Sequence, residues 1–194
     1  YRLAVRKEKI MADKNISFVI SAKTINEAVK IITEDDENIE FFVGRRYVAL
    51  KIKGYIIVSR KIEGEFINYK KIMPSTFSTK VKINTKEVIS IIERISLIIN
   101  DQLKTPMRCK IGEQEIVFSC ATALGRATDT YKVEINGEQF EIGINNRFLL
   151  DALKACETDE VVLNFNGAFS SVIILPTEND DFIYMIMPMR LKAE

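Results

Sequence analysis

The feature that most constrains the fold of this chain is a unit that occurs three times, a short amphipathic helix followed by three β-rich runs. In the first copy, Thr24 and Glu27 have the spacing of a capping box. Apolar residues then recur at helical intervals, at Ile25, Ala28, Val29 and Ile32. The runs IEFFVG, RYVALKIKG and YIIVSRKIEG follow, separated by glycine-containing turns that are typical of strand ends. The pattern predicts an α+β fold built by repetition.

The second and third copies carry the same signals. Asn84 and Glu87 predict a capped helix in the second copy, and Asn145 or Asn146 caps the helix of the third. Strands are expected near residues 106–111, 114–121 and 128–136 in the second copy and near 160–166, 169–175 and 182–187 in the third. The segment EINGEQFEIGINNR reads as a short turn that joins the two copies.

One such unit leaves a sheet face and a helix stripe uncovered, so two copies packed together should form one domain. Copies two and three would be such a pair, whereas the first copy has no mate. The chain also opens without a methionine, on residues that are typical of a strand interior. We therefore expect the front part of a longer protein to be missing. Pro74, Ser75 and Thr76 interrupt the pattern, so the break between two domains is expected within GEFINYKKIMPST.

The residue types disfavour an enzyme. The chain contains no histidine, which excludes Ser-His-Asp and Cys-His catalysis and removes the commonest metal ligand. The acidic runs Asp35-Asp36-Glu37 and Asp180-Asp181 lie in polar segments typical of solvated loops. No phosphate-binding glycine motif occurs. We therefore expect no catalytic residues, no metal and no cofactor.

The cysteines and the hydropathy pattern favour a soluble protein of a reducing compartment. Cys109, Cys120 and Cys156 are odd in number and far apart, which is typical of reduced, buried thiols. No apolar run is long enough to cross a bilayer, and the first residues do not resemble a signal peptide. The sequence therefore predicts a cytoplasmic protein without a membrane partner.

Leu97 lies on the outer side of the second predicted helix. It follows Val88, the centre of the apolar stripe, by nine residues, so at about 100° per residue it projects away from the core. Four further residues share the stripe with Val88: Ile91, Ile92, Ile95 and Ile99. Leu97 is then either a leucine that happens to be exposed or part of a subunit contact, and helix geometry leaves both open.

Cations recur at intervals of seven or eight residues on the outer faces of the helices. The pairs are Lys23 with Lys30, Lys86 with Arg94, and Arg147 with Lys154. They form either ordinary solvated helix surfaces or, if the helices line one concave surface, a track for a phosphate backbone. Because the net charge is only +1, such contacts would depend on local arrangement rather than on bulk attraction.

Four stretches resemble the bacterial DNA polymerase III beta subunit family, the sliding clamps. YRLAVRK resembles the strand after the family's T-D-G-[HY]-R-L motif, and GEFINYKKIMP resembles the linker between its second and third domains. INNRFLLDALKA resembles the family's F-N-x-x-Y-L-L-D-A-L helix, and YMIMPMRL is close to its C-terminal motif. The four matches stand in the family's order and extend from one end of the chain to the other.

The resemblance implies a DNA-clamp fold, with helices on one face and antiparallel sheets on the other. Members of the family form a head-to-tail ring of two subunits and six domains that encircles duplex DNA without sequence specificity and performs no catalysis. This chain would be the C-terminal part of such a homodimeric processivity factor, and the resemblance implies that it holds the second half of the middle domain, residues 1–72, and the complete third domain, residues 73–194. The implied protein partners are the DNA polymerase III alpha subunit, the clamp loader and repair proteins.

The family binds short peptides, of the type Q-x-x-L/M-x-F, in a pocket between its middle and third domains. Carried over by position, the resemblance implies fifteen pocket residues here: Tyr1, Arg2, Leu3, Ile67, Lys71, Ile72, Phe169, Ser171, Met185, Ile186, Met187, Pro188, Met189, Arg190 and Leu191. Flexible thioethers and branched aliphatic side chains suit such a ligand. Ile67 stands where the family has a proline, which would loosen that wall of the pocket.

The resemblance also assigns roles to the outer helix residues. Leu97 and Ile98 stand where the family has the apolar part of its dimer interface. The segment CATALGRATDTYKVEI lacks the family's run of glutamates, so the charged part of that interface is not carried over. The six helix cations become candidates to face DNA. The alternative is a stand-alone peptide-binding adaptor that keeps the pocket but forms no ring.

Overall fold

The computed structural model describes residues 1–10, 15–33, 38–99 and 105–191, and it divides the chain into two compact units. The large unit consists of Tyr1–Lys9 and Lys70–Glu194, and the small unit consists of Ile10–Tyr69. The first residues of the chain therefore lie with its C-terminal part. These compact units do not test the predicted division into domains of residues 1–72 and 73–194, which stays a prediction.

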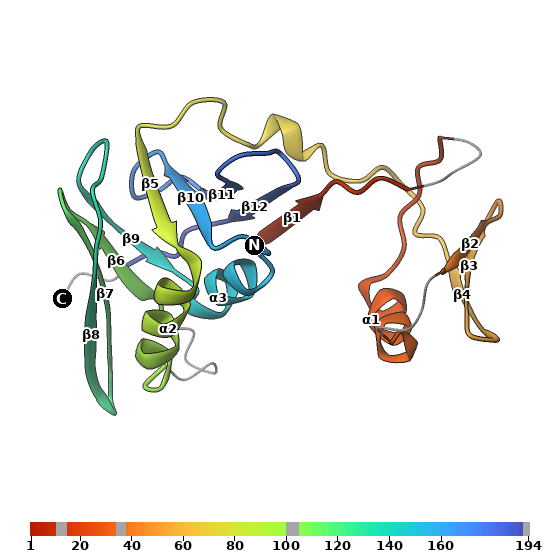
Figure 1. Ribbon diagram of the computed structural model, residues 1–194, viewed down its shortest axis with the longest axis horizontal. Helices are drawn as coiled ribbons and strands as arrows, with labels where there is room; N and C mark the ends of the chain where they lie inside the picture. The colour runs from red at the N-terminus through yellow and green to blue at the C-terminus, as the bar shows by residue number, and fades with distance from the viewer. Residues whose placement is uncertain (11–14, 34–37, 100–104, 192–194) are drawn as a thin grey trace. The chain divides into compact units, whose positions relative to one another are not determined.

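The large unit contains two antiparallel sheets and two helices (Figure 1). The five-stranded sheet has the order β1 (Arg2–Arg6), β12 (Phe182–Ile186), β11 (Val172–Pro176), β10 (Glu160–Phe165) and β5 (Thr79–Asn84). The four-stranded sheet has the order β8 (Gly125–Lys132), β7 (Glu115–Thr122), β6 (Met107–Ile111) and β9 (Phe140–Ile144). The helices are α2 (Thr85–Ser96) and α3 (Asn146–Lys154). This arrangement confirms the predicted α+β class.

Asparagine side chains cap both helices of the large unit. Asn84 accepts a hydrogen bond from the backbone N–H of Glu87 at 3.1 Å, as predicted. Its own N–H donates to the Tyr131 hydroxyl at 2.9 Å, so that donor is satisfied from strand β8 rather than from the capping-box glutamate. Of the two candidates in the third copy, Asn145 is the cap and accepts from the Phe148 N–H at 3.0 Å.

A single core lies between the helices and the two sheets. Helices α2 and α3 pack against each other. Every second residue of the covering strands is buried, as the patterns of β5, β6 and β7 show. Asn146, one residue after the cap of α3, is also buried and donates to the Ser96 hydroxyl at 2.8 Å, which in turn donates to the Ile92 carbonyl. The two helices are thus joined by a polar link as well as by apolar packing.

The strand predictions for the large unit were incomplete. Strand β5 was not predicted, although its alternating residues bury one face. The supposed short turn before α3 contains β9, which pairs with β6 along its whole length. Strand β8 begins at Gly125 rather than near residue 128, and β11 begins at Val172 rather than near residue 169. Polar and glycine residues concealed these strands, because tertiary pairing overrides weak local propensity.

The small unit is a single helix on a three-stranded sheet. Helix α1 (Ala22–Ile31) packs on the sheet formed by β2 (Glu40–Val43), β3 (Tyr47–Ile52) and β4 (Tyr55–Arg60). The helix cap is Ser21, not Thr24 as predicted, and it accepts from the Thr24 N–H at 3.4 Å. The Thr24 hydroxyl shares a hydrogen bond with that of Ser59 instead, at 2.8 Å. A short 3-10 helix, η1 (Tyr69–Lys71), spans the residues where the large unit resumes.

Candidate functional site

The first and last strands of the chain lie side by side in the large unit. Strand β1 pairs antiparallel with β12, so that Arg2 lies opposite Ile186 and Leu3 opposite Met185. The pairing continues beyond the strands, because the Met187 N–H donates to the Tyr1 carbonyl at 3.0 Å. The residues at the two ends of the chain that the resemblance assigns to one pocket therefore do lie together. Strand β1 is the edge of its sheet, which leaves its outer backbone groups unpaired by any other strand in the described ranges.

Helix α3 fastens this edge strand through two arginines. The Arg2 guanidinium pairs with the Asp151 carboxylate and lies 4.7 Å from the centre of the Phe148 ring. Arg6 pairs with Glu157 at 2.8 Å and donates to the Ala155 carbonyl at 3.3 Å. The motif INNRFLLDALKA suggested a helix but not these contacts, because the partners lie about 150 residues apart in sequence.

The residues after β12 cross to the second sheet. The Met189 N–H donates to the Gly143 carbonyl of β9 at 2.8 Å. Gly143 is buried, and a Cβ added to it would lie 2.6 Å from the Met189 carbonyl oxygen and 2.8 Å from the Leu191 side chain. The tail therefore approaches β9 at a distance that only glycine permits. Sequence reasoning missed Gly143, whose only signal was a glycine inside a short apolar run.

The pocket residues predicted from the C-terminal motif differ in exposure. Met185 and Ile186 are buried, so they lie beneath the surface and cannot themselves contact a ligand there. Met187 is 40% exposed, and Arg190 is also exposed. Pro188, Met189 and Leu191 are half-buried. The tail thus presents a partly exposed row of apolar side chains beside the edge strand.

The remaining predicted pocket residues are not all joined to this surface. Ser171 is buried immediately before β11, and Phe169, in the turn after β10, is 91% exposed. Lys71 ends η1 and is followed by the exposed Ile72, and no described residue forms a hydrogen bond or ion pair that joins either to the tail. Ile67 belongs to the small unit and is exposed there.

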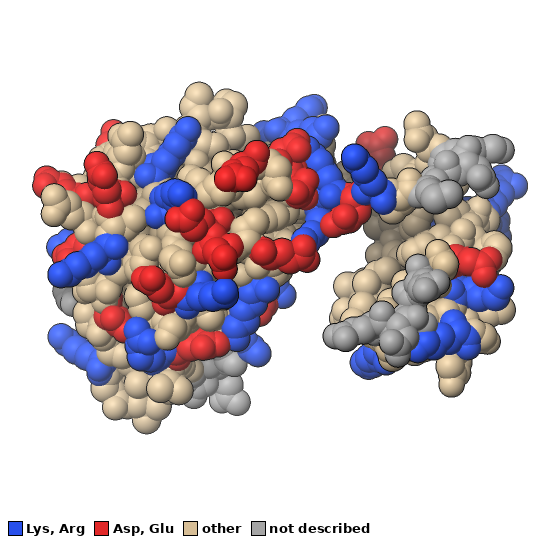
Figure 2. All heavy atoms as spheres, in the orientation of Figure 1, with Lys and Arg blue, Asp and Glu red and all other residues tan. Residues whose placement is uncertain are grey.

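Most of the helix cations predicted to face DNA are engaged in ion pairs. Four of them contact carboxylates: Lys30 with Glu27 at 2.9 Å, Lys86 with Asp159 at 2.9 Å, Arg94 with Asp129 at 2.6 Å and Lys154 with Glu93 at 2.6 Å. Lys23 and Arg147 are exposed. Figure 2 shows the same intermingling of positive and negative side chains across the large unit. Such exposed ion pairs contribute little to stability.

The two residues predicted for a subunit contact differ from each other. Leu97 follows α2 and is 82% exposed, which confirms that it projects away from the core. Ile98 is half-buried and packs against the core of the large unit. One exposed apolar side chain is ordinary, so the exposure of Leu97 does not by itself identify a contact surface.

The cysteines and acidic residues considered above for metal binding or catalysis are explained by burial or by ion pairs where the structure describes them. All three cysteines are free, and burial raises the pKa of Cys120 above its usual value and that of Cys156 to about 11. Asp180 pairs with Lys7, whereas Asp35-Asp36-Glu37 lie outside the described residues. In the described ranges no group of three potential ligands is close enough to hold a metal, and no helix is long and apolar enough to span a membrane.

Comparison with known proteins identifies relatives along the whole chain. Residues 1–68 match the model of the central domain of the DNA polymerase III beta subunit, and residues 70–190 match that of its C-terminal domain. The Staphylococcus epidermidis beta sliding clamp is 28% identical over 98% of this chain and 51% of its own length.

Solved structures give the same result. The Bacillus subtilis sliding clamp matches with a TM-score of 0.90 and 26% identity, over 98% of this chain and 52% of its own. The Thermotoga maritima beta subunit matches with a TM-score of 0.84 and 30% identity, over 99% and 53%. The chain therefore spans about half the length of the relatives it matches.

Proposed function

The chain belongs to the DNA polymerase III beta subunit family, and from this we propose that it acts as part of a sliding clamp. In this proposal a homodimeric ring encircles duplex DNA in the cytoplasm, performs no catalysis and tethers polymerase, clamp loader and repair proteins. The observation that carries the proposal is that two domain models match in consecutive order over residues 1–68 and 70–190. The paired ends of the chain supply the surface to which partner peptides would bind.

The proposed peptide site uses the tail beside the edge strand. Met187 and the half-buried Met189 and Leu191 offer flexible apolar side chains that adapt to a leucine or phenylalanine of the peptide. The exposed edge of β1 adds backbone donors and acceptors, which extended peptides use by joining a sheet. Gly143 and Asp151 do not face the peptide in this proposal but hold the tail and the edge strand in place.

Fluorescence polarisation tests the peptide site. A labelled peptide with the pattern Q-x-x-L-x-F is titrated with the 194-residue chain and with two variants. Met187→Ala should weaken binding about tenfold, which corresponds to roughly 1.4 kcal/mol, because it removes an apolar side chain at the centre of the tail. Leu124→Ala is the matched control, since Leu124 is exposed in the turn between β7 and β8. Equal affinities of the two variants, or no binding by the unaltered chain, would contradict the proposal.

Light scattering tests the ring. Fusing the chain to the N-terminal half of the Bacillus subtilis relative supplies the length that the match does not span. The fusion should have the mass of a dimer, and Leu97→Asp should convert it to a monomer because a charge would enter an apolar interface. A fusion that is monomeric with or without the substitution, yet still binds the peptide, would instead support the stand-alone adaptor.

A further inference from the structure

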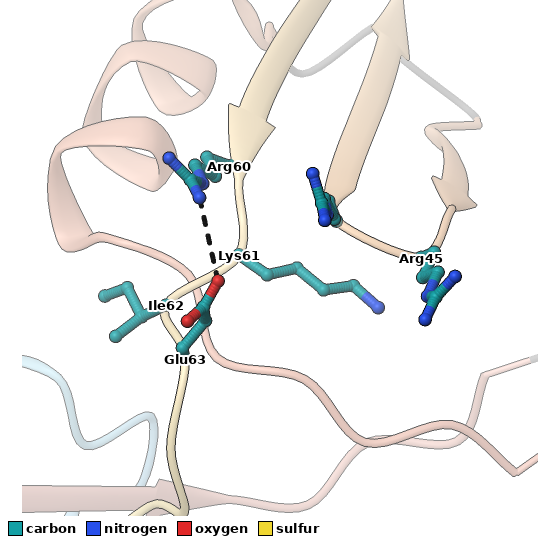
Figure 3. Close-up of a pocket in the computed structure, with 6 residues that line it drawn as sticks. Arg45, Arg60, Lys61, Ile62 and Glu63 are labelled. Atoms are coloured by element: carbon teal, nitrogen blue, oxygen red, sulfur yellow. Dashed lines mark ion pairs between the residues drawn. The ribbon is translucent and has the colours of Figure 1, made fainter.

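A cationic hollow lies on the small unit, formed by residues to which no function has been assigned so far. It is enclosed by the turn between β2 and β3 and by the residues that end and follow β4, and it has a volume of about 210 Å³ (Figure 3). Its lining consists of Arg45, Arg46, Arg60, Lys61, Ile62 and Glu63. Four cations therefore surround a hollow that contains a single carboxylate.

Backbone hydrogen bonds fix the two walls of the hollow relative to each other. The Lys61 N–H donates to the Arg46 carbonyl at 2.9 Å, which joins the segment after β4 to the turn. The turn itself is closed by the Gly44 N–H, which donates to the Tyr47 carbonyl at 2.9 Å. Because the backbone on both sides is paired, the fold fixes the backbone positions from which the four cationic side chains extend.

The charge in the hollow is not neutralised by the protein. Glu63 pairs with Arg60 at 3.6 Å, but no carboxylate of the described part of the chain pairs with Arg45, Arg46 or Lys61. Residues 41–62 contain six lysines and arginines and no aspartate or glutamate. In Figure 3 the Lys61 side chain extends in the direction of Arg45. This contrasts with the helix cations, most of which have carboxylate partners.

We propose that this hollow binds a phosphate group of a nucleic-acid backbone. Guanidinium groups offer forked donors that match phosphate oxygens, and the two free oxygens of a backbone phosphate can accept hydrogen bonds from more than one of these groups at once. The bound phosphate supplies the negative charge that balances the surrounding cations. The assignment of the phosphate to a nucleic acid rests on the proposed function, whereas the phosphate site itself does not.

The position of the hollow supports the nucleic-acid backbone as its source. The Ile62 N–H donates to the Val19 carbonyl at 2.8 Å, which places the hollow beside the residues that lead into α1. Lys23 follows in the first turn of that helix, is exposed and has no ion pair in the described ranges. Lys23 and the hollow would therefore offer two phosphate contacts on the same unit, as a repeating backbone requires.

Nuclear magnetic resonance tests the phosphate site independently of DNA. Inorganic pyrophosphate is titrated into the ¹⁵N-labelled 194-residue chain, with the ionic strength held constant by sodium chloride. The backbone amides of residues 44–47 and 60–63 should shift in a saturable manner, and the double variant Arg45→Ala/Arg46→Ala should abolish these shifts. Shifts that are absent, that spread evenly over the chain or that persist in the variant would overturn the site.

Fluorescence anisotropy with a labelled duplex of about 20 base pairs tests the source of the phosphate. The slope of log Kobs against log[salt] should fall by about one for each phosphate that Arg45→Ala/Arg46→Ala can no longer bind. Lys80→Ala/Lys110→Ala removes the same charge from exposed positions of β5 and β6 and should leave the slope nearly unchanged. Equal slopes for the two double variants would overturn the nucleic-acid assignment.

The two experiments separate failure of this site from failure of the proposed function. If pyrophosphate binds but the unaltered chain has no affinity for the duplex, the backbone assignment fails, the phosphate site stands, and the ring is decided separately by light scattering of the fusion. If the duplex binds but pyrophosphate does not, the hollow fails and the clamp proposal stands. Displacement of pyrophosphate by a glutamate-rich peptide at lower concentrations than by the duplex would assign the hollow to a protein partner and contradict our proposal.

Discussion

The large unit contains two packed copies of the repeated helix-and-strand element, whereas the small unit contains one copy. Among the described residues, the core of the large unit comprises 24 buried residues from two helices and two sheets, whereas that of the small unit comprises only Ala28, Val48, Leu50 and Ile52. The difference does not come from local sequence, because both units have capped amphipathic helices on antiparallel strands. It comes from whether a second copy is present to cover the helix.

The helix caps allow the copies to be compared position by position. Four and eight residues after the caps of α2 and α3 stand Val88 with Ile92 and Leu149 with Leu153, all buried because these helices pack together. At the same positions α1 has Ile25 and Val29, which are 39% and 60% exposed. One copy is therefore sufficient to form the secondary structure and a small core, whereas two copies packed together form a large core.

The largest expected effect concerns equivalent positions in this comparison. Ile92→Ala should lower the free energy of unfolding of the large unit by about 2–5 kcal/mol, because it leaves a cavity in a fully packed core. Val29→Ala, at the same position of α1, should change stability by less than about 0.5 kcal/mol, because the side chain is already exposed. Urea denaturation followed by circular dichroism measures both, and equal reductions would show that α1 is covered after all.

An intermediate effect is expected from the polar link between α2 and α3. Asn146→Ala removes the donor to Ser96 and should cost about 0.5–1.5 kcal/mol, since the half-buried Ser96 hydroxyl loses this partner but still donates to the Ile92 carbonyl. Asn26→Ala is the matched control on the unpaired helix α1, where Asn26 is exposed and alanine favours the helix. The unfolding curve of Asn146→Ala should shift to lower stability, whereas that of Asn26→Ala should stay in place or shift to higher stability. A larger destabilisation by Asn26→Ala would contradict this account of how the paired helices are joined.

The smallest effect concerns one exposed ion pair in each unit. Hydrogen bonds from Lys86 and from Lys30 lower the pKa of Asp159 and of Glu27, respectively. A carboxyl group whose pKa is lowered by folding stabilises the fold above its unfolded pKa, and that contribution disappears as the pH falls through its folded pKa. The stability of the fold should therefore decline slightly as the pH falls below the ordinary pKa values of these groups, which are 3.8 for Asp159 and 4.5 for Glu27.

The variants Asp159→Asn and Glu27→Gln check this dependence separately for the large and small units. Each should remove part of the decline in melting temperature between about pH 5 and 3, and both effects should shrink in high salt because the groups are exposed. A decline of the same size in both variants and in the unaltered chain would mean that other carboxyl groups are responsible.

Much of the fold could be predicted from local patterns. The apolar stripe of α2, its Asn84 cap and the outward projection of Leu97 follow from the helical period, and the structure confirms all three. Strand β9 could not be predicted, because FEIGI is short and contains a glycine, and its pairing with β6 joins segments far apart in sequence. The Thr24 capping box was wrong because Ser21 offers an equivalent hydroxyl three residues earlier.

The candidate surface shows the same division. The motif YMIMPMRL indicated the tail, but it could not show that Met185 and Ile186 are buried while Met187 is exposed. That distinction arises because successive residues of β12 point to opposite faces of the sheet and both faces are covered at Met185 and Ile186, whereas Met187 follows the end of the strand. The arginines of the hollow were present in the sequence too, but the turn and the residues after β4 converge only through their backbone hydrogen bond.

The sequence by itself determined the repeated helix-and-strand unit, the absence of histidine chemistry and the motifs that indicated the family. These are properties of short segments, in which period, capping and residue type are sufficient. Only the tertiary structure decided which copy has a closed core, that Arg2 is bound to α3 and that the tail requires Gly143. Each of these depends on surfaces distant in sequence coming within a few ångströms, which no local pattern encodes.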